Sequence, residues 1–432
     1  MNTRILLFSL ALFGIFFGGC QPKVYLMPAP IGFDQDTILF EVSNIDRDEN
    51  LLYTAYATNR LPFEKPAQNN RYSIFPADTI RLGLVVHRVG NPGMSWDELR
   101  AISLDNARSQ ELLIKQEWLR EQVVIDLSEE LTDANPGADS FFATLNKALA
   151  KTSNKDILVY VHGANSNFYR ATAQGAQYYH FTGHNTIVIT FSWPSAENLL
   201  KYKTDVLHAK KTVPAFAHLI AVLAERTNAR NINILAYSAG AQVVTPGLTY
   251  LGRRLANLKA ADLKEKYRIG EVYFAAPDTD FAPFFDRYME FKDIVERTTI
   301  NINFKDTILR FAAIQNGLSR LGRPDLSELT EEELTTVLQM IRTDRLDILN
   351  VGNSDALQLG GAHDSWYNHP WVSNDLLLLM LYNASPSERG LEKYELGGGA
   401  TGYYFPENYH HFIKELRRIS RESFLGRYPD RQ

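Results

Sequence analysis

Residues 234–242 read I-L-A-Y-S-A-G-A-Q, an apolar run that ends in a serine among small residues. Residues 236–240 differ from the G-x-S-x-G pattern of a nucleophile elbow in having alanine at the first position. In such an elbow the serine stands on a strained turn between a strand and a helix. A serine in an ordinary turn can have the same local sequence, so the role of Ser238 has to be inferred from the surrounding chain.

The chain around Ser238 alternates buried strands with helices. Continuous apolar runs predict parallel strands at 157–161, 186–191, 231–237, 271–276, 298–304 and 346–351. Helical patterns lie at 139–151, 171–179, 211–226, 239–255, 307–321, 330–343 and 371–382. A T-x-x-E capping box at Thr330 and Glu333 opens one of these helices. The alternation predicts an α/β fold with a mostly parallel, doubly wound sheet, in which Ser238 has the context of an elbow.

The flanking regions have other patterns. Short apolar runs separated by turn residues predict strands over 24–105, an N-terminal β-rich extension of the sheet that forms residues 20–105. We predict a helix over 106–125 and an α/β domain over 106–385. Residues 386–432 contain three consecutive glycines and many aromatic residues, and the sequence assigns them no role.

Two backbone amides are candidates for an oxyanion hole. Ala239 follows the serine at a helix start, where N–H groups face a developing negative charge. The earlier strand in V-Y-V-H-G-A, residues 159–164, leads to a second candidate donor, Ala164, with Gly163 giving the backbone freedom. His162 precedes the serine and abuts a strand, so we interpret it as a structural residue.

A base for Ser238 is found in the loop after the last predicted strand. His363 in G-G-A-H-D has the place that the order Ser…Asp…His requires. His369 precedes a proline at a helix start, which favours a structural role.

The acid of the triad has two candidates at neighbouring strand ends. Asp306 follows the second strand after the nucleophile helix, the usual position in α/β-hydrolases, although it could merely cap the next helix. Asp278 follows the first of these strands, as in some lipases, and could equally be a turn residue; Asp280 is a weaker option. We favour Asp306 and expect its carboxylate within hydrogen-bond reach of a His363 ring nitrogen.

The N-terminus has the pattern of a secretory signal. Arg4 precedes a continuous apolar stretch over 5–17, which is short for a membrane span. Gly18 and Gly19 then precede Cys20, the single cysteine of the chain, and this arrangement resembles a bacterial lipobox. The resemblance implies a signal peptide over 1–19, lipid attachment at Cys20, and a cell-envelope protein anchored to a membrane, which we expect to be the outer membrane.

Composition and charge limit the classes of binding partner that the sequence supports. The 432 residues carry a net charge of −5 and no basic stripe, so the sequence gives no sign of nucleic-acid binding. No histidine spacing fits a metal site, and we expect neither a metal nor a cofactor. The expected partners are a small-molecule or lipid ester and a membrane surface.

The motifs together resemble an uncharacterised group of bacterial α/β-hydrolases, often lipoproteins, in the esterase–lipase superfamily. The matching strings cover most of residues 25–385 and are L-M-P-A-P (26–30), Y-A-T-N-R (56–60), R-L-G-L-V-V (81–86), V-H-G-A-N-S-N-F (161–168), F-S-W-P-S (191–195), Tyr202 with Asp205, A-Y-S-A-G (236–240), A-A-P-D-T-D (275–280), F-K-D-T-I-L (304–309) and G-A-H-D-S-W-Y-N-H-P (361–370). The resemblance implies an α/β-hydrolase fold and a hydrolase site without a known substrate.

The leading hypothesis is therefore a membrane-anchored serine hydrolase that acts on carboxylic esters through an acyl-enzyme. Trp193 and Pro194 follow a strand end and could line an acyl pocket, although a core position for the tryptophan is equally compatible. Two alternatives stay open: an acyltransferase with the same triad, and a binding or scaffolding lipoprotein on the same fold.

Overall fold

The structure is a computed structural model that describes most of the chain. The described residues are 23–32, 50–67, 70–105, 110–128, 136–152, 154–254, 259–342, 345–352 and 363–427. The predicted signal peptide and Cys20 lie outside the described residues.

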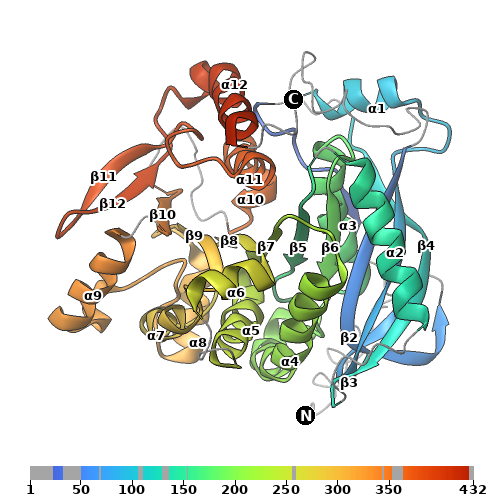
Figure 1. The fold of residues 1–432 in the computed structure, drawn as a ribbon, viewed down its shortest axis with the longest axis horizontal. Helices are drawn as coiled ribbons and strands as arrows, with labels where there is room; N and C mark the ends of the chain where they lie inside the picture. The colour runs from blue at the N-terminus through green and yellow to red at the C-terminus, as the bar shows by residue number, and fades with distance from the viewer. Residues whose placement is uncertain are drawn as a thin grey trace, which may run out of the picture.

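A single mixed sheet of 12 strands runs through the molecule (Figure 1). Its spatial order is β1-β4-β3-β2-β6-β5-β7-β8-β9-β10-β12-β11. The strands are β1 (Val24–Tyr25), β2 (Leu51–Ala67), β3 (Asn70–Val89), β4 (Leu113–Asp126), β5 (Ile157–Val161), β6 (Ile187–Phe191), β7 (Ile232–Tyr237), β8 (Ile269–Ala275), β9 (Val295–Ile302), β10 (Leu346–Asn350), β11 (Glu392–Gly397) and β12 (Ala400–Tyr404). All neighbours from β2 through β6 to β12 pair in parallel, so the predicted α/β fold is confirmed.

The N-terminal strands form an antiparallel extension on one side of this sheet. Strands β2, β3 and β4 follow one another as a meander, and β2 joins the parallel part through β6. The predicted helix over 106–125 is wrong, because residues 113–126 are the strand β4. Its charged, helix-favouring side chains are overridden by pairing with β3 from Thr79↔Asp126 to Val89↔Ile114.

Helices cover both faces of the sheet. One core holds the side chains of α2 (Pro136–Lys151), α4 (Tyr202–Arg226), α5 (Ala241–Arg254), α6 (Ala260–Tyr267), α7 (Phe281–Phe291) and α9 (Glu331–Arg342). A second core holds those of α1 (Trp96–Ser103), α3 (Phe168–Phe181), α10 (Ser365–Asn368), α11 (Pro370–Tyr382) and α12 (Tyr409–Arg427). Strand residues alternate between the cores: Val159 packs in the first and Tyr160 in the second. The remaining helix, α8 (Thr307–Asn316), follows β9.

The C-terminal segment completes the edge of the sheet beyond β10. Strands β11 and β12 form a hairpin whose turn uses Gly397, Gly398 and Gly399, all at positive φ. Strand β12 pairs in parallel with β10, and α12 packs on α11 (Figure 1). Residues 392–427 therefore extend the sheet and one of its helical layers.

Helix α4 is long and apolar enough to cross a membrane by length and composition. More than half of that apolar window is buried, and α4 packs against α5 and the sheet. These contacts are those of a core helix.

Candidate active site

Ser238 stands on a strained turn at the end of β7. Its φ of 50° is left-handed, and the short 3₁₀ helix Ser238–Gly240 leads directly into α5. A side chain at Gly240 would come within 2.6 Å of the Val161 carbonyl oxygen, so only glycine fits there. These features are those of a nucleophile elbow, and alanine at position 236 is accommodated in the core.

His363 bridges the serine and a carboxylate. Its Nε2 lies 2.7 Å from Ser238 Oγ, and its Nδ1 lies 2.7 Å from Asp306 Oδ2. The other carboxylate oxygen of Asp306 accepts the amide of Leu309 at 2.9 Å and caps α8. Asp306 thus contacts both the His363 ring and the first turn of α8, because its two oxygens face different partners.

Asp278, the alternative acid, is held by other groups. Arg320 Nε donates to Asp278 Oδ1 at 2.5 Å, and the Tyr202 hydroxyl donates to Oδ2 at 2.7 Å. Asp280 pairs with the same Arg320. Both oxygens of Asp278 are therefore engaged away from His363, although the residue lines the same cavity as Ser238.

Two buried charged residues, Arg60 and Asp205, form hydrogen bonds with the loop that carries Ala164. Arg60 donates to the Ser166 carbonyl at 2.6 Å. Asp205 accepts the backbone amides of Ala196 and Asn165. Burial raises the pKa of Asp205 to about 6, against the amides and Arg60, which favour its charged form. These two residues were missed as site residues in the sequence, although both fall within its family-like strings.

The loop that carries Ala164 also packs closely against Ser238. A side chain at Gly163 would lie 3.0 Å from Ser238 Cβ. Ala164 lines the cavity of Ser238, and Ala239 is buried in the first turn after it. The two candidate oxyanion donors thus flank the serine from the loop and from the helix start.

Two histidines and a tryptophan belong to the scaffold. The His162 ring is fully buried and stacks on Trp193 at 5.3 Å between centroids. His369 accepts the Trp371 amide and caps α11. Trp193 is likewise fully buried and does not line the cavity of Ser238. It is therefore a core residue and not part of an acyl pocket.

The serine opens into a cavity of about 450 Å³ with two kinds of wall. Thr307, Ile308, Phe311 and Ala312 of α8 supply a mainly apolar part. The polar part comes from α3, from α10 and from the residue before α10, and includes Arg170, Gln174, Asp364 and Tyr367.

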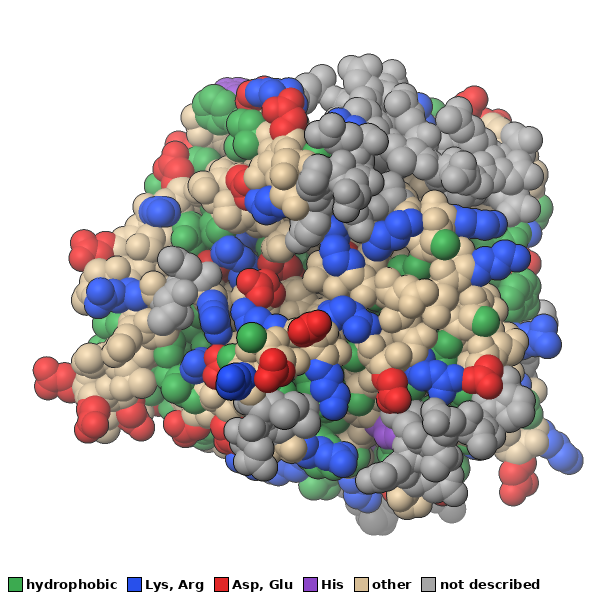
Figure 2. All heavy atoms as spheres, in the orientation of Figure 1, with side chains coloured by type: hydrophobic (Ala, Val, Ile, Leu, Met, Phe, Trp, Pro, Cys, Tyr) green, Lys and Arg blue, Asp and Glu red, His purple; other side chains and the backbone are tan. Residues whose placement is uncertain are grey.

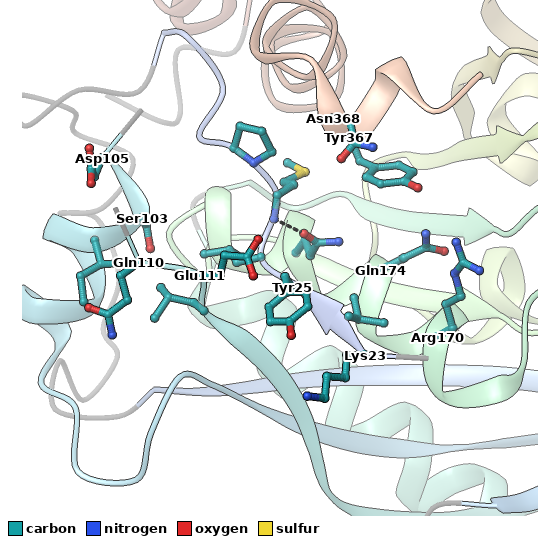
Figure 3. A pocket seen from close by; sticks show the side chains of 17 residues that line it. Lys23, Tyr25, Ser103, Asp105, Gln110, Glu111, Arg170, Gln174, Tyr367 and Asn368 are labelled. Carbon is teal, nitrogen blue, oxygen red and sulfur yellow. Dashed lines mark hydrogen bonds between the residues drawn. The ribbon is translucent and has the colours of Figure 1, made fainter. Parts of the chain in front are cut away.

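A second cavity of about 360 Å³, whose lining side chains are drawn in Figure 3, shares part of its wall with the first. Arg170, Gln174 and Tyr367 line both, so the polar wall of the first cavity separates the two. Lys23 and Tyr25, labelled in Figure 3, line the second cavity from β1 and its flank. The space beside Ser238 is thus polar toward the second cavity and apolar along α8.

The described residues contain no group of three or more His, Cys, Asp and Glu side chains that could hold a metal ion. His180 contacts the Ser103 hydroxyl at 2.9 Å in the core.

A family model described as an alpha/beta hydrolase of unknown function (DUF900) matches residues 137–377, more than half of the chain. The chain belongs to this family of alpha/beta hydrolases. The match includes Ser238, Asp306 and His363 and leaves the antiparallel extension and the C-terminal hairpin outside.

The chain is also similar to an uncharacterized protein, alr1448, of Nostoc sp.. The two are 29% identical over 197 residues, which cover 38% of this chain and 48% of the relative. The chain therefore spans about half the length of this curated relative.

Proposed function

We propose that this alpha/beta hydrolase is a serine esterase that cleaves carboxylic esters through an acyl-enzyme on Ser238. The observation that carries the proposal is the unbroken hydrogen-bonded chain from Ser238 Oγ through His363 to Asp306. The strained φ of Ser238 supports it further, because such backbone strain is characteristic of nucleophile elbows.

In the proposed reaction His363 Nε2 takes the proton of Ser238 as Oγ attacks the ester carbonyl. Asp306 holds the Nδ1–H tautomer and stabilises the imidazolium that forms. The amides of Ala239 and Ala164 donate to the oxyanion of the tetrahedral intermediate.

The intermediate then collapses. The alkoxide of the leaving group departs with the proton that His363 carries, and the acyl group stays on Ser238. A water molecule gives its proton to His363 and attacks the acyl carbonyl, so that a carboxylic acid leaves and Ser238 regains its proton.

We further propose that the mature protein begins at a lipidated Cys20 and is anchored in the cell envelope, at the outer membrane. The Gly18-Gly19-Cys20 pattern after a short apolar stretch supports this proposal. Mass spectrometry of the N-terminus tests it: a diacylglycerol-modified Cys20 is expected, and an unmodified N-terminus elsewhere would refute it.

Hydrolysis of a soluble nitrophenyl ester tests the enzymatic proposal. Wild-type protein is expected to turn it over, and Ser238→Ala is expected to lose this activity by a factor of about 10⁶, as in serine hydrolases without their nucleophile. Thr307→Ala removes another hydroxyl from the same cavity and is expected to keep the activity. Equal rates for wild type and Ser238→Ala would overturn the proposal.

A further inference from the structure

Helix α8 turns most of its large apolar side chains outward. Leu309 and Ala312 are buried, whereas Ile308, Phe311 and Ile314 are exposed, with 73% of Ile314 accessible. A surface helix normally presents polar side chains on its outer side. A continuous exposed apolar face of this kind marks an interaction site.

The apolar face continues the wall of the catalytic cavity. Ile308 and Phe311 line the cavity that contains Ser238, and Ile314 extends the same side of the helix outward. Phe304 before the helix and Leu318 after it are exposed as well. We call Phe304, Ile308, Phe311, Ile314 and Leu318 together the α8 rim.

The start of α4 adjoins the α8 rim. Asn316 Nδ2 donates to the Tyr202 hydroxyl at 3.0 Å, which joins the end of α8 to the first residue of α4. Leu200, just before α4, is 93% exposed. Because Tyr202 also lines the cavity of Ser238, Leu200 lies two residues along the chain from that cavity.

The exposed charges in these two segments are all basic. Lys305 and Arg310 flank the apolar face of α8, and Lys201 and Lys203 follow Leu200. None of the four forms an ion pair within the described part of the chain. The acidic residues of residues 199–207 and 304–318, Asp205 and Asp306, are buried. Figure 2 shows basic and acidic side chains interspersed over one face of the molecule.

We propose that the α8 rim docks on the surface of an anionic lipid bilayer and that the substrate is an amphiphilic ester taken from that surface. Apolar side chains enter the interface while lysine and arginine meet anionic head groups, which is the composition found here. The acyl chain lies along Ile308 and Phe311, and the polar part of the ester faces Arg170 and Gln174. This inference rests on the proposed esterase function.

The test compares one soluble and one membrane-borne substrate for the full-length protein. Nitrophenyl butyrate is supplied in solution, and nitrophenyl palmitate in vesicles of equal parts phosphatidylcholine and phosphatidylglycerol. The variant Ile314→Ser/Leu318→Ser changes the rim outside the cavity lining. It is expected to lower the vesicle rate about thirtyfold or more, since each of the two lost apolar side chains weakens interfacial binding by about 1–2 kcal/mol, and to leave the soluble rate unchanged.

Phe412→Ser is the matched control, because Phe412 is a similarly exposed apolar residue on α12, outside both cavities. It is expected to change neither rate. Equal losses in Phe412→Ser and the rim variant, or a rim variant that keeps its vesicle rate, would overturn the inference while leaving the esterase intact. Failure of wild-type protein on the soluble ester would instead reject the esterase function itself.

The basic residues provide an independent arm. Lys203→Gln/Arg310→Gln is expected to reduce the preference for anionic over pure phosphatidylcholine vesicles about thirtyfold, equivalent to about 2 kcal/mol, because each of the two basic residues near such a surface contributes about 1 kcal/mol. An unchanged preference contradicts the docking surface. A change of oligomeric state in the rim variant, measured by light scattering, would assign the face to a second copy of the chain and overturn the inference.

Discussion

Asp278 and Asp306 occupy equivalent places at the same edge of the sheet and yet have different partners. Each follows a parallel strand, β8 for Asp278 and β9 for Asp306, and each is at most 3% exposed. Asp278 is held by the Arg320 guanidinium and the Tyr202 hydroxyl. Asp306 is held by a helix amide and the His363 ring.

The difference shows that strand position alone does not assign an acid to a triad. A carboxylate whose two oxygens are both taken by strong donors cannot also orient an imidazole, because that needs one free oxygen in the plane of the ring. Asp306 keeps such an oxygen because its cap uses only the other one. The pairing with Arg320, which lies more than forty residues along the chain from Asp278, thus distinguishes Asp278 from Asp306.

Among substitutions of the buried carboxylates, the largest effect is expected from Asp306→Asn. The amide cannot stabilise the imidazolium or hold the required tautomer of His363, so kcat should fall by about 10⁴-fold with near-normal stability. Steady-state kinetics on a soluble ester, with circular dichroism as the stability control, measure this. A loss below tenfold would contradict the role of Asp306.

Asp278→Asn is expected to have the opposite effect, a large loss of stability with a small loss of kcat. Breaking the buried pair with Arg320 should cost about 3 kcal/mol of unfolding free energy, while kcat should fall far less than in Asp306→Asn. Urea denaturation and steady-state kinetics on the same preparation measure both quantities. A large loss of kcat with unchanged stability would exchange the roles of the two residues.

Asp205→Asn sharpens the comparison with a third carboxylate, one that holds the Ala164 loop. An amide accepts the backbone N–H groups of Ala196 and Asn165 less strongly than a carboxylate, so kcat/KM should fall about thirtyfold, equivalent to about 2 kcal/mol. The expected kinetic signature is a lower kcat with little change in KM, since the loop faces the oxyanion. A pure rise in KM would place the effect in substrate binding instead.

Glu271, on β8, is a buried carboxylate with no hydrogen-bond partner for either oxygen within the described residues. Arg297 lies 3.7 Å away, too far for a hydrogen bond, and burial raises the pKa of Glu271 to about 8. Because this pKa lies above that of the unfolded chain, the stability it contributes is present at low pH and lost as pH rises toward 8.

Glu271→Gln is therefore expected to remove a slope of about 1.4 kcal/mol per pH unit from the unfolding free energy between about pH 5 and 8. Denaturation midpoints of wild type and variant across that range measure the difference. Parallel pH profiles would show that Glu271 is charged in the folded protein.

The parts of this site that the sequence predicted are those with a local signal. Ser238, Asp306 and His363 each stand directly after a strand or in the loop that follows one, and the capping box of Thr330 and Glu333 forms as expected. Strand ends, caps and turns depend on neighbouring residues, so a single sequence carries them.

The parts that were missed depend on distant contacts. Strand β4 reads as a helix because its glutamates, lysine and glutamines favour one, and only its pairing with β3 makes it a strand. Arg60 reaches Ser166 from more than a hundred residues away, and no local pattern marks such a contact. The same holds for the engagement of Asp278 by Arg320.

The most direct test of the account is labelling of the full-length protein with a fluorophosphonate, followed by mass spectrometry of the modified peptide. The account predicts one adduct on Ser238 in the wild type, no adduct in Ser238→Ala, much slower labelling in Asp306→Asn, and nearly unchanged labelling in Asp278→Asn. An adduct on another residue, or equal labelling of the wild type and Asp306→Asn, would contradict it.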